Sequence, residues 1–330
     1  MELTHRNLVT AIRQILSVTS SSELEGVAYC FLPMYHIYGF NVVLNSTLAD
    51  GTRLHIRERF DIEDCIDTVE RERVTWLPVV PPVMLSLLAH PNIHERDLSS
   101  LRTLSVGAAP VALSAVDRLR QVTGVTIRQG WGMTETAGTG STNSIECSWD
   151  PAESAGVAVE GFEFRIVDRE TGDRVLETNE IGELTVRGEN IMLGYHNAPE
   201  ESRKVLRNGW LYTGDIARVD EHRRLHIEDR ERQMIKYKGF QVTPAELESV
   251  ILELPEVRDC AVIGEKDCDA GEIPKAYVVP SDGVVLTKQH IFDHVAGQVA
   301  GYKKVRVVEF VKCIPRSPVG KILKQQLVRG

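Results

Sequence analysis

Residues 101–129, LRTLSVGAAPVALSAVDRLRQVTGVTIRQ, decide the fold of this chain. Short apolar runs at 101–106 and 125–129 are typical of strands, and residues 113–124 between them carry apolar side chains at helical spacing. Two strands joined by a helix usually lie parallel, because the helix carries the chain back to the end of the sheet where the first strand began. The stretch therefore predicts one strand–helix–strand unit of a parallel sheet.

The same alternation is present towards the N-terminus. Strands are expected at 27–32, 52–56 and 74–80, with a helix at 62–72. The longest apolar run, residues 74–89, is short for a membrane span and is interrupted by prolines, so it predicts a buried strand, a proline turn and a helix. Alternating strands and helices indicate an α/β fold with a doubly wound parallel sheet.

After Gly161 the pattern becomes one of short strands separated by turn residues. Such strands are expected at 162–168, 182–188, 210–220 and 223–230, and the last two are expected to form a hairpin. This part of the sequence predicts a small β-rich subdomain.

A third pattern begins where the β-rich part ends. Thr243 and Glu246 form a predicted capping box, with Pro244 at the first position of a helix. Further strands are expected at 260–265, 276–280 and 305–311, and a second helix at 287–299. We therefore expect a large N-terminal domain over 1–231, made of the doubly wound sheet and the β-rich subdomain. A small α+β C-terminal domain is expected over 232–330.

Composition excludes several classes of protein. The 330 residues are 42% hydrophobic and 26% charged, as in an ordinary globular protein, and the net charge of −9 argues against a nucleic-acid-binding surface. The six cysteines are scattered without a C-x-x-C pair, which is typical of reduced thiols in an intracellular protein. We therefore expect a cytoplasmic protein that neither binds nucleic acid nor spans a membrane.

The first candidate site is residues 129–136, QGWGMTET, which follow a predicted strand of the sheet. Ligands collect at the carboxyl ends of such strands. Thr134 offers a hydroxyl to a phosphate, and Glu135 offers a hard oxygen to Mg²⁺. A dinucleotide-binding fingerprint would need a third glycine where Glu135 stands. Spacing alone is equally compatible with a glycine turn that carries an exposed glutamate.

Four other stretches contain candidate residues. Asp215 follows a glycine and a predicted strand, so its carboxylate suits a ribose, and the charged residues 229–241 suit a hinge. Lys321 lies on a proline- and glycine-rich loop, and His36 lies among aromatic residues. Each stretch alone fits an ordinary structural role as well or better: an Asx turn, a solvated linker, a surface lysine or a core histidine.

Taken together and in this order, these stretches resemble the adenylate-forming superfamily, in the branch of 4-coumarate–CoA ligase and luciferase. The resemblance covers essentially the whole chain, and its signatures are QGWGMTE, GELTVRGENIMLGYHN, GWLYTGD, IKYKGFQVTPAELE and PRSPVGKIL. In that family, the segment similar to residues 4–8 follows a Ser/Thr/Gly-rich loop that holds the phosphates of ATP. The resemblance therefore implies that this sequence begins inside the N-terminal domain, just after that loop.

The resemblance implies an acid–CoA ligase. A small-molecule carboxylic acid attacks the α-phosphate of ATP in the presence of Mg²⁺, which gives an acyl-adenylate and pyrophosphate, and the thiol of the co-substrate CoA then attacks the adenylate. Val42 and Ser105 stand where hydroxycinnamate ligases carry other pocket side chains. Aryl acids and medium-chain fatty acids both remain open as substrates.

The resemblance also implies roles for single residues. Lys321 steadies the attacking carboxylate and the α-phosphate, Lys236 acts near the second step, and His36 gates the acyl pocket. The metal ligand is Glu135, and the hinge is Arg232. The remaining positions contact the nucleotide (Ala108, Ala109, Pro110, Gln129, Gly130, Trp131, Thr134, Asp215, Arg230 and Gln241), the acyl group (Tyr38 and Gly132) or CoA (Lys238 and Gly239).

Two other functions compete with an acid–CoA ligase. One is a non-catalytic remnant that only binds AMP, acyl-adenylate or CoA. The other is an adenylation domain that loads a carrier protein, against which the segment IKYKGFQV favours a CoA ligase.

Overall fold

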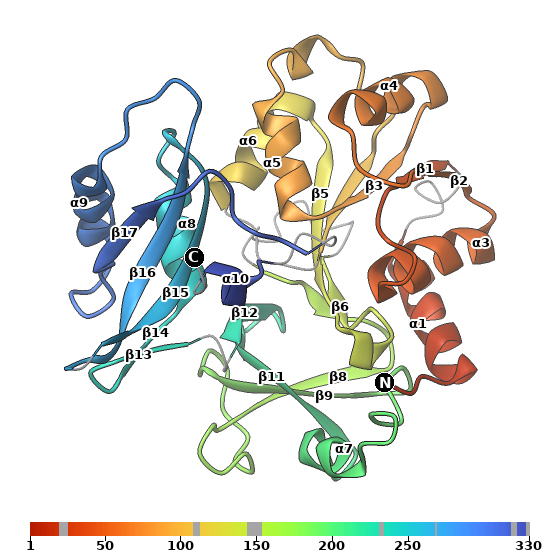
Figure 1. Cartoon of the computed structure of the whole chain (residues 1–330). Coiled ribbons are helices and arrows are strands. Elements are labelled where there is room, and N and C mark those ends of the chain that lie inside the picture. Colours follow the sequence, from red (N-terminus) through yellow and green to blue (C-terminus); the bar gives the residue numbers. More distant parts are fainter. Residues whose placement is uncertain are drawn as a thin grey trace. The chain divides into compact units, whose positions relative to one another are not determined.

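The computed structural model describes residues 1–19, 26–107, 113–143, 154–230, 234–267, 269–317 and 322–327 (Figure 1). The chain forms two compact units. The first comprises Met1–Thr213, Ala217–Ile227 and Pro318–Gly320, and the second comprises Gly214–Ile216, Glu228–Ser317 and Lys321–Gly330.

The first unit is built on a sheet with the strand order β2-β1-β3-β4-β5-β6-β7. The first five strands are parallel, whereas β6 and β7 are antiparallel additions at the β5 edge. The strands are β1 Val27–Cys30, β2 Arg53–Ile56, β3 Trp76–Val79, β4 Thr103–Val106, β5 Thr126–Trp131, β6 Ser141–Thr142 and β7 Val157–Ala158. The predicted doubly wound α/β sheet is confirmed.

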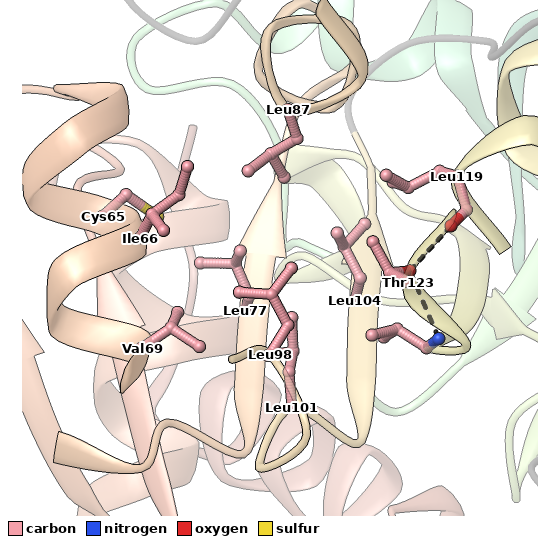
Figure 2. Close-up of a pocket in the computed structure, with 11 residues that line it drawn as sticks. Cys65, Ile66, Val69, Leu77, Leu87, Leu98, Leu101, Leu104, Leu119 and Thr123 are labelled. Carbon is pink, nitrogen blue, oxygen red and sulfur yellow. Dashed lines mark hydrogen bonds between the residues drawn. The ribbon is translucent and has the colours of Figure 1, made fainter. Parts of the chain in front are cut away.

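Helices α4 (Ile62–Glu72), α5 (Pro81–Ala89) and α6 (Leu113–Thr123) pack with this sheet around one apolar core. Figure 2 shows the centre of this core, where a space of about 10 Å³ is lined by apolar side chains and Thr123. The space is too small for a substrate, so it is a gap in packing. The predicted proline turn is wrong, because Pro81 and Pro82 begin α5 directly after Val80.

Three further helical segments of the first unit pack on one another: α1 (His5–Val18), η1 (Tyr38–Asn45, a π-helix) and α3 (Ser46–Asp50). Thr4 caps α1, since its hydroxyl accepts a hydrogen bond from the Asn7 amide while the Asn7 side chain accepts one from the Thr4 amide. This reciprocal cap satisfies two of the amides that a helix start leaves unpaired.

The β-rich part forms a second sheet with the order β10-β11-β9-β8, and β12 pairs with β11. Its strands are β8 Phe162–Val167, β9 Gly182–Gly188, β10 Leu206–Arg207, β11 Trp210–Val219 and β12 Leu225–Arg230. Helix α7 (Pro199–Val205) precedes β10, and the short 3₁₀ segments η2 (Ile93–Glu95) and η3 (Thr134–Thr136) complete the first unit.

The second unit is a sheet with the order β14-β13-β16-β15, with β17 paired to β16. The elements are β13 Ile235–Tyr237, β14 Phe240–Val242, α8 Pro244–Leu252, β15 Val257–Asp267, β16 Gly271–Pro280, α9 Lys288–Gln298, β17 Val307–Phe310 and α10 Lys324–Leu327. Pro244 starts α8 as expected, but Thr243 makes no side-chain cap, because its hydroxyl lies 3.7 Å from the Met234 sulfur. Within the described residues, every helix is too short or too polar to cross a bilayer.

Candidate functional site

The glycine loop, residues 132–139, follows the carboxyl end of β5 and folds back on itself. A Cβ on Gly132 would lie 2.3 Å from the Gly138 carbonyl oxygen, so no larger residue fits there without moving the backbone. The Gly138 amide donates to the Met133 carbonyl at 3.0 Å, and Ala137 takes a left-handed φ of 54°. A non-glycine residue in this conformation is uncommon, and such strain persists only where the surroundings hold it.

The surroundings hold the glycine loop by its carbonyl groups. The side-chain amide of the buried Asn190 donates to the carbonyls of Thr136 and Thr139, each at 2.9 Å. The side-chain amide of Asn41, which is also buried, donates to the Ala137 carbonyl at 2.9 Å. These bonds fix the backbone of the loop at Thr136, Ala137 and Thr139, and both asparagines come from distant parts of the sequence.

Glu135 and Thr134 are half-buried side chains of this loop. The Tyr195 hydroxyl donates to Oε1 of Glu135 at 3.0 Å, and the Met192 amide donates to the Glu135 carbonyl at 2.9 Å. Among the described residues, the Thr134 hydroxyl makes no hydrogen bond, and no three His, Cys, Asp or Glu side chains gather into a metal cage. A single fixed carboxylate fits Mg²⁺, which usually binds one or two carboxylates together with substrate phosphates.

The η1 helix forms a wall beside the glycine loop. The Tyr38 hydroxyl donates to the Ser105 carbonyl at 2.9 Å, and a Cβ on Gly107 would lie 3.2 Å from the Tyr38 ring. Burial raises the pKa of Tyr38, so this phenol remains a neutral donor. A Cβ on Gly138 would lie 2.8 Å from Val42, which places η1 against the loop.

His36 precedes η1 and is held by its own backbone. Its amide donates to the Pro33 carbonyl at 3.0 Å, and its Nδ1 accepts from the Tyr38 amide at 3.2 Å. In the neutral ring, this arrangement leaves the proton on Nε2. The structure therefore fixes His36 and Tyr38 next to each other at the start of η1, the helix whose Val42 packs against Gly138 of the glycine loop.

The three residues before the glycine loop are held by β6 and by the second sheet. The Gln129 amide donates to Oδ1 of Asn143 at 2.7 Å, and a Cβ on Gly130 would lie 2.7 Å from the Ser141 carbonyl oxygen. The Trp131 ring lies 6.4 Å from the Phe162 ring and belongs to an apolar cluster of the second sheet. Trp131 therefore has a packing role, whatever it contributes to a nucleotide site.

The second unit carries another group of candidate residues on the β13–β14 hairpin. Lys236 lies directly opposite Gln241 in the strand register. Lys238 and Gly239 form the turn, with φ values of 47° and 83°, which is the pattern of a type I′ turn. The Lys238 amide donates to the Ala270 carbonyl at 2.8 Å, so the turn is anchored at its base.

The remaining candidates are placed less completely. Asp215 is only 2% exposed and lies inside β11 after Gly214, which has a φ of 71°. The strand expected at 210–220 is therefore confirmed as one continuous strand, and the separate expectation that Asp215 comes after a strand is wrong. Arg230 is the last residue of β12. The side chain of Arg230 and the whole of Ala108, Ala109, Pro110, Arg232 and Lys321 lie outside the described residues.

The segments on both sides of Lys321 are nevertheless anchored in the second unit. Arg316 forms a β-bridge with Ile322, and its guanidinium lies 2.7 Å from the Asp259 carboxylate. Lys324 pairs with Glu248 at 3.5 Å. The described residues that flank Lys321 are therefore held in place.

Comparison with known proteins identifies the family of this site. Residues 1–196 match the family model "AMP-binding enzyme", and residues 246–321 match the model "AMP-binding enzyme C-terminal domain". The chain belongs to the AMP-binding enzyme family. Its α/β fold, with a large N-terminal part and a smaller C-terminal part, is that of adenylate-forming enzymes.

Similar proteins of this family have names that describe CoA ligases. The chain is 41% identical to "4-coumarate--CoA ligase 2" from Nicotiana tabacum and 39% identical to "Probable CoA ligase CCL5" from Humulus lupulus, with 98% of the chain aligned in both. It spans only 61% and 60% of the lengths of these two relatives.

Solved structures of the family superpose closely on the chain. ATP-bound MatB from Rhodopseudomonas palustris matches with a TM-score of 0.91 and 30% identity, covering 98% of this chain and 64% of that one. The anthranilate CoA ligase AuaEII in complex with anthranoyl-AMP matches with a TM-score of 0.90 and 27% identity, covering 99% and 64%.

Sequence reasoning missed the residues that hold the glycine loop in this AMP-binding enzyme. Asn190 and Tyr195 lie in GENIMLGYHN, a signature to which no role was attached, and Asn41 lies between the apolar residues Phe40 and Val42. The available signal was an asparagine among apolar residues, since a buried amide needs partners.

Proposed function

We propose that this chain is part of an acid–CoA ligase. In the first step, a carboxylate oxygen of the acid bonds to the α-phosphorus of ATP, and pyrophosphate leaves. In the second step, the CoA sulfur bonds to the acyl carbon, its proton is lost to solvent, and AMP leaves. Family membership and the names of the relatives, which are 38–41% identical over nearly the whole chain, support this activity.

The observation that carries the proposal is the rigid glycine loop at the end of β5. Its carbonyls are bound by Asn41, Asn190 and the Met192 amide, which leaves Thr134 and Glu135 as the side chains available to a ligand. Thr134 would contact phosphate and Glu135 would hold Mg²⁺. When bound, Mg²⁺ neutralises phosphate charge. Groups held in place before the reaction stabilise developing charge most effectively.

The other residues receive roles by the same proposal. Asp215 and Arg230 bind the ribose side of the nucleotide, and Lys321 lies between the two reacting anions. The nucleotide and the acyl group lie between 108–110, 129–131 and the wall of His36, Tyr38 and Gly132. In the second step, Lys236 and Gln241 contact the adenylate, Lys238 and Gly239 border the CoA path, and Arg232 is the hinge between domains 1–231 and 232–330.

The test is pyrophosphate release by the purified chain with ATP, Mg²⁺, CoA and a panel of aryl and fatty acids. A ligase releases pyrophosphate only with its own acid and forms the CoA thioester. Glu135→Gln should reduce release by about a hundredfold or more, the usual effect of losing one charge-stabilising group. Melting-point stabilisation by a non-hydrolysable acyl-adenylate mimic, without pyrophosphate release, would favour the binding-only alternative. If the chain shows neither pyrophosphate release nor stabilisation by the mimic, both functions are contradicted.

The proposed roles also predict that the two steps separate by mutation. Lys321→Ala should abolish most pyrophosphate release, because two anions would then meet without a cation between them. It should largely spare the conversion of supplied acyl-adenylate to acyl-CoA. Lys324→Ala is the matched control, since Lys324 is on the same segment but pairs with Glu248. Equal losses in both steps would rule out the role given to Lys321.

A further inference from the structure

We infer that Tyr195 is a positioning residue for the metal-binding carboxylate of Glu135. The inference rests on the proposed role of Glu135, and it assigns a task to a residue of the GENIMLGYHN segment. The Tyr195 hydroxyl lies 3.0 Å from Oε1 of Glu135 and donates to it.

The backbone of Tyr195 is itself held in place. Its amide donates to the Ser202 hydroxyl on α7 at 2.8 Å, and that hydroxyl donates to the Ala198 carbonyl at 2.9 Å. A tyrosine has only two side-chain torsions, so a fixed backbone places its hydroxyl with little freedom. The hydroxyl therefore meets Glu135 from a defined direction.

The segment before Tyr195 is bound on two sides. On one side, the Asn7 side chain of α1 donates to the carbonyls of Glu189 and Ile191 at 2.7 and 2.8 Å. On the other side, the Met192 amide donates to the Glu135 carbonyl at 2.9 Å. The segment thus binds both the backbone and the side chain of the proposed metal ligand, and α1 keeps it in position.

The chemistry of the donor suits a metal ligand. A lysine or arginine at this position would also orient the carboxylate, but its charge would repel a bound cation, whereas a phenol is neutral. Among the described residues, Oε2 of Glu135 makes no hydrogen bond, so the Tyr195 bond leaves that oxygen for the metal. Groups that orient a metal ligand typically contribute about 10–100-fold to metal affinity.

The experiment measures the binding of Mn²⁺ to the chain in the presence of ATP. The concentration of free Mn²⁺ is monitored by electron paramagnetic resonance. Tyr195→Phe keeps the ring and removes the hydroxyl, so we expect the apparent dissociation constant for Mn²⁺ to rise about tenfold. Binding of ATP without metal, measured by thermal shift, should not change. Tyr29→Phe is the matched control, because it removes a tyrosine–carboxylate bond of 2.9 Å to Asp64 on α4.

The outcomes separate this inference from the proposed function. The positioning role is overturned if the Tyr195→Phe chain melts like the wild type and binds Mn²⁺ as tightly. In that case the metal role of Glu135 still stands if Glu135→Gln loses Mn²⁺ binding. Unchanged affinity in Glu135→Gln overturns the metal role itself. If Tyr195→Phe does not fold, Ser202→Ala decides: weaker Mn²⁺ binding supports the inference, and unchanged binding overturns it.

Discussion

Gly132 shows how one residue determines whether the site forms at all. Its missing side chain is required by space, since a Cβ would meet the Gly138 carbonyl oxygen at 2.3 Å. We expect Gly132→Ala to lower the free energy of unfolding by about 1–3 kcal/mol, the usual cost of overpacking. Gly297→Ala on α9 is the control, because nothing lies within 4 Å of its Cβ position and alanine favours a helix. Equal unfolding free energies in urea for the two variants would contradict this account of Gly132.

The buried carboxyl of Asp220 makes the free energy of unfolding depend on pH. Burial tends to raise the pKa of its carboxyl. The carboxylate also accepts hydrogen bonds from His226 at 3.0 Å, from the Arg224 side chain at 2.8 Å and from two backbone amides. These hydrogen bonds outweigh burial and hold the pKa of Asp220 well below its usual range. A depressed folded-state pKa stabilises the protein above the unfolded-state pKa of about 4. This stabilisation is lost as pH falls from about 4 towards the lower, folded-state value.

Asp220→Asn should therefore flatten the acid side of the stability curve. At neutral pH we expect it to cost about 3–5 kcal/mol, because the substitution breaks a buried ion pair between Asp220 and Arg224. The measurement is the free energy of unfolding in urea at a series of pH values from 2 to 7. A variant with the same slope below pH 4 as the wild type would show that other carboxylates produce the acid sensitivity.

At the scale of elements, two hairpins of the described residues share one type of turn, and this allows a controlled test. The β10–β11 turn, Asn208 and Gly209, has φ values of 50° and 78°, close to the 47° and 83° of Lys238 and Gly239. Nothing lies within 4 Å of the Cβ position of either glycine. A side chain at either position therefore has space, and each substitution costs about 1–2 kcal/mol in backbone strain.

Gly239→Leu and Gly209→Leu should thus destabilise the protein equally and differ in function. If Lys238 and Gly239 border the CoA path, Gly239→Leu slows the conversion of supplied acyl-adenylate to acyl-CoA and leaves pyrophosphate release unchanged. Gly209→Leu should leave both steps at the wild-type rate. Similar rates of thioester formation in the two variants would remove the CoA role of the β13–β14 turn.

At the scale of the whole molecule, the second unit has a core of its own. Its largest apolar cluster joins α8, α9 and the sheet through residues between Ile235 and Val308, such as Leu247, Ile251 and Ile291, all fully buried. A domain with a local core can fold alone. We expect residues 233–330 to unfold in one cooperative thermal transition, and Ile251→Ala to cost about 2–5 kcal/mol. A broad thermal transition, with no flat folded-state baseline before it, would show that residues 233–330 need the rest of the chain to fold.

Most elements were predictable from sequence because they bury one face. Residues 62–72 form α4 as expected, and each of the five parallel strands lies within a predicted apolar run or extends it by two residues. Local rules failed where another contact competed: the Thr243 hydroxyl turns to Met234 instead of capping α8, and Asp215 continues a strand through a glycine with positive φ. The short β6 and β7 were not predicted, since two residues carry no period.

The sequence by itself determined most elements, the α/β fold class and the family, because side-chain spacing and signature motifs are local properties of a chain. The signatures also named the candidate residues, whose roles are still predictions. Only the tertiary structure decided what holds the glycine loop: Asn41 and Asn190 lie 96 and 54 residues from the carbonyls of Ala137 and Thr136 that they bind, and Tyr195 lies 60 residues from the carboxylate of Glu135. Hydrogen bonds to backbone carbonyls over such separations leave no period or motif in the sequence, since every residue offers the same acceptor.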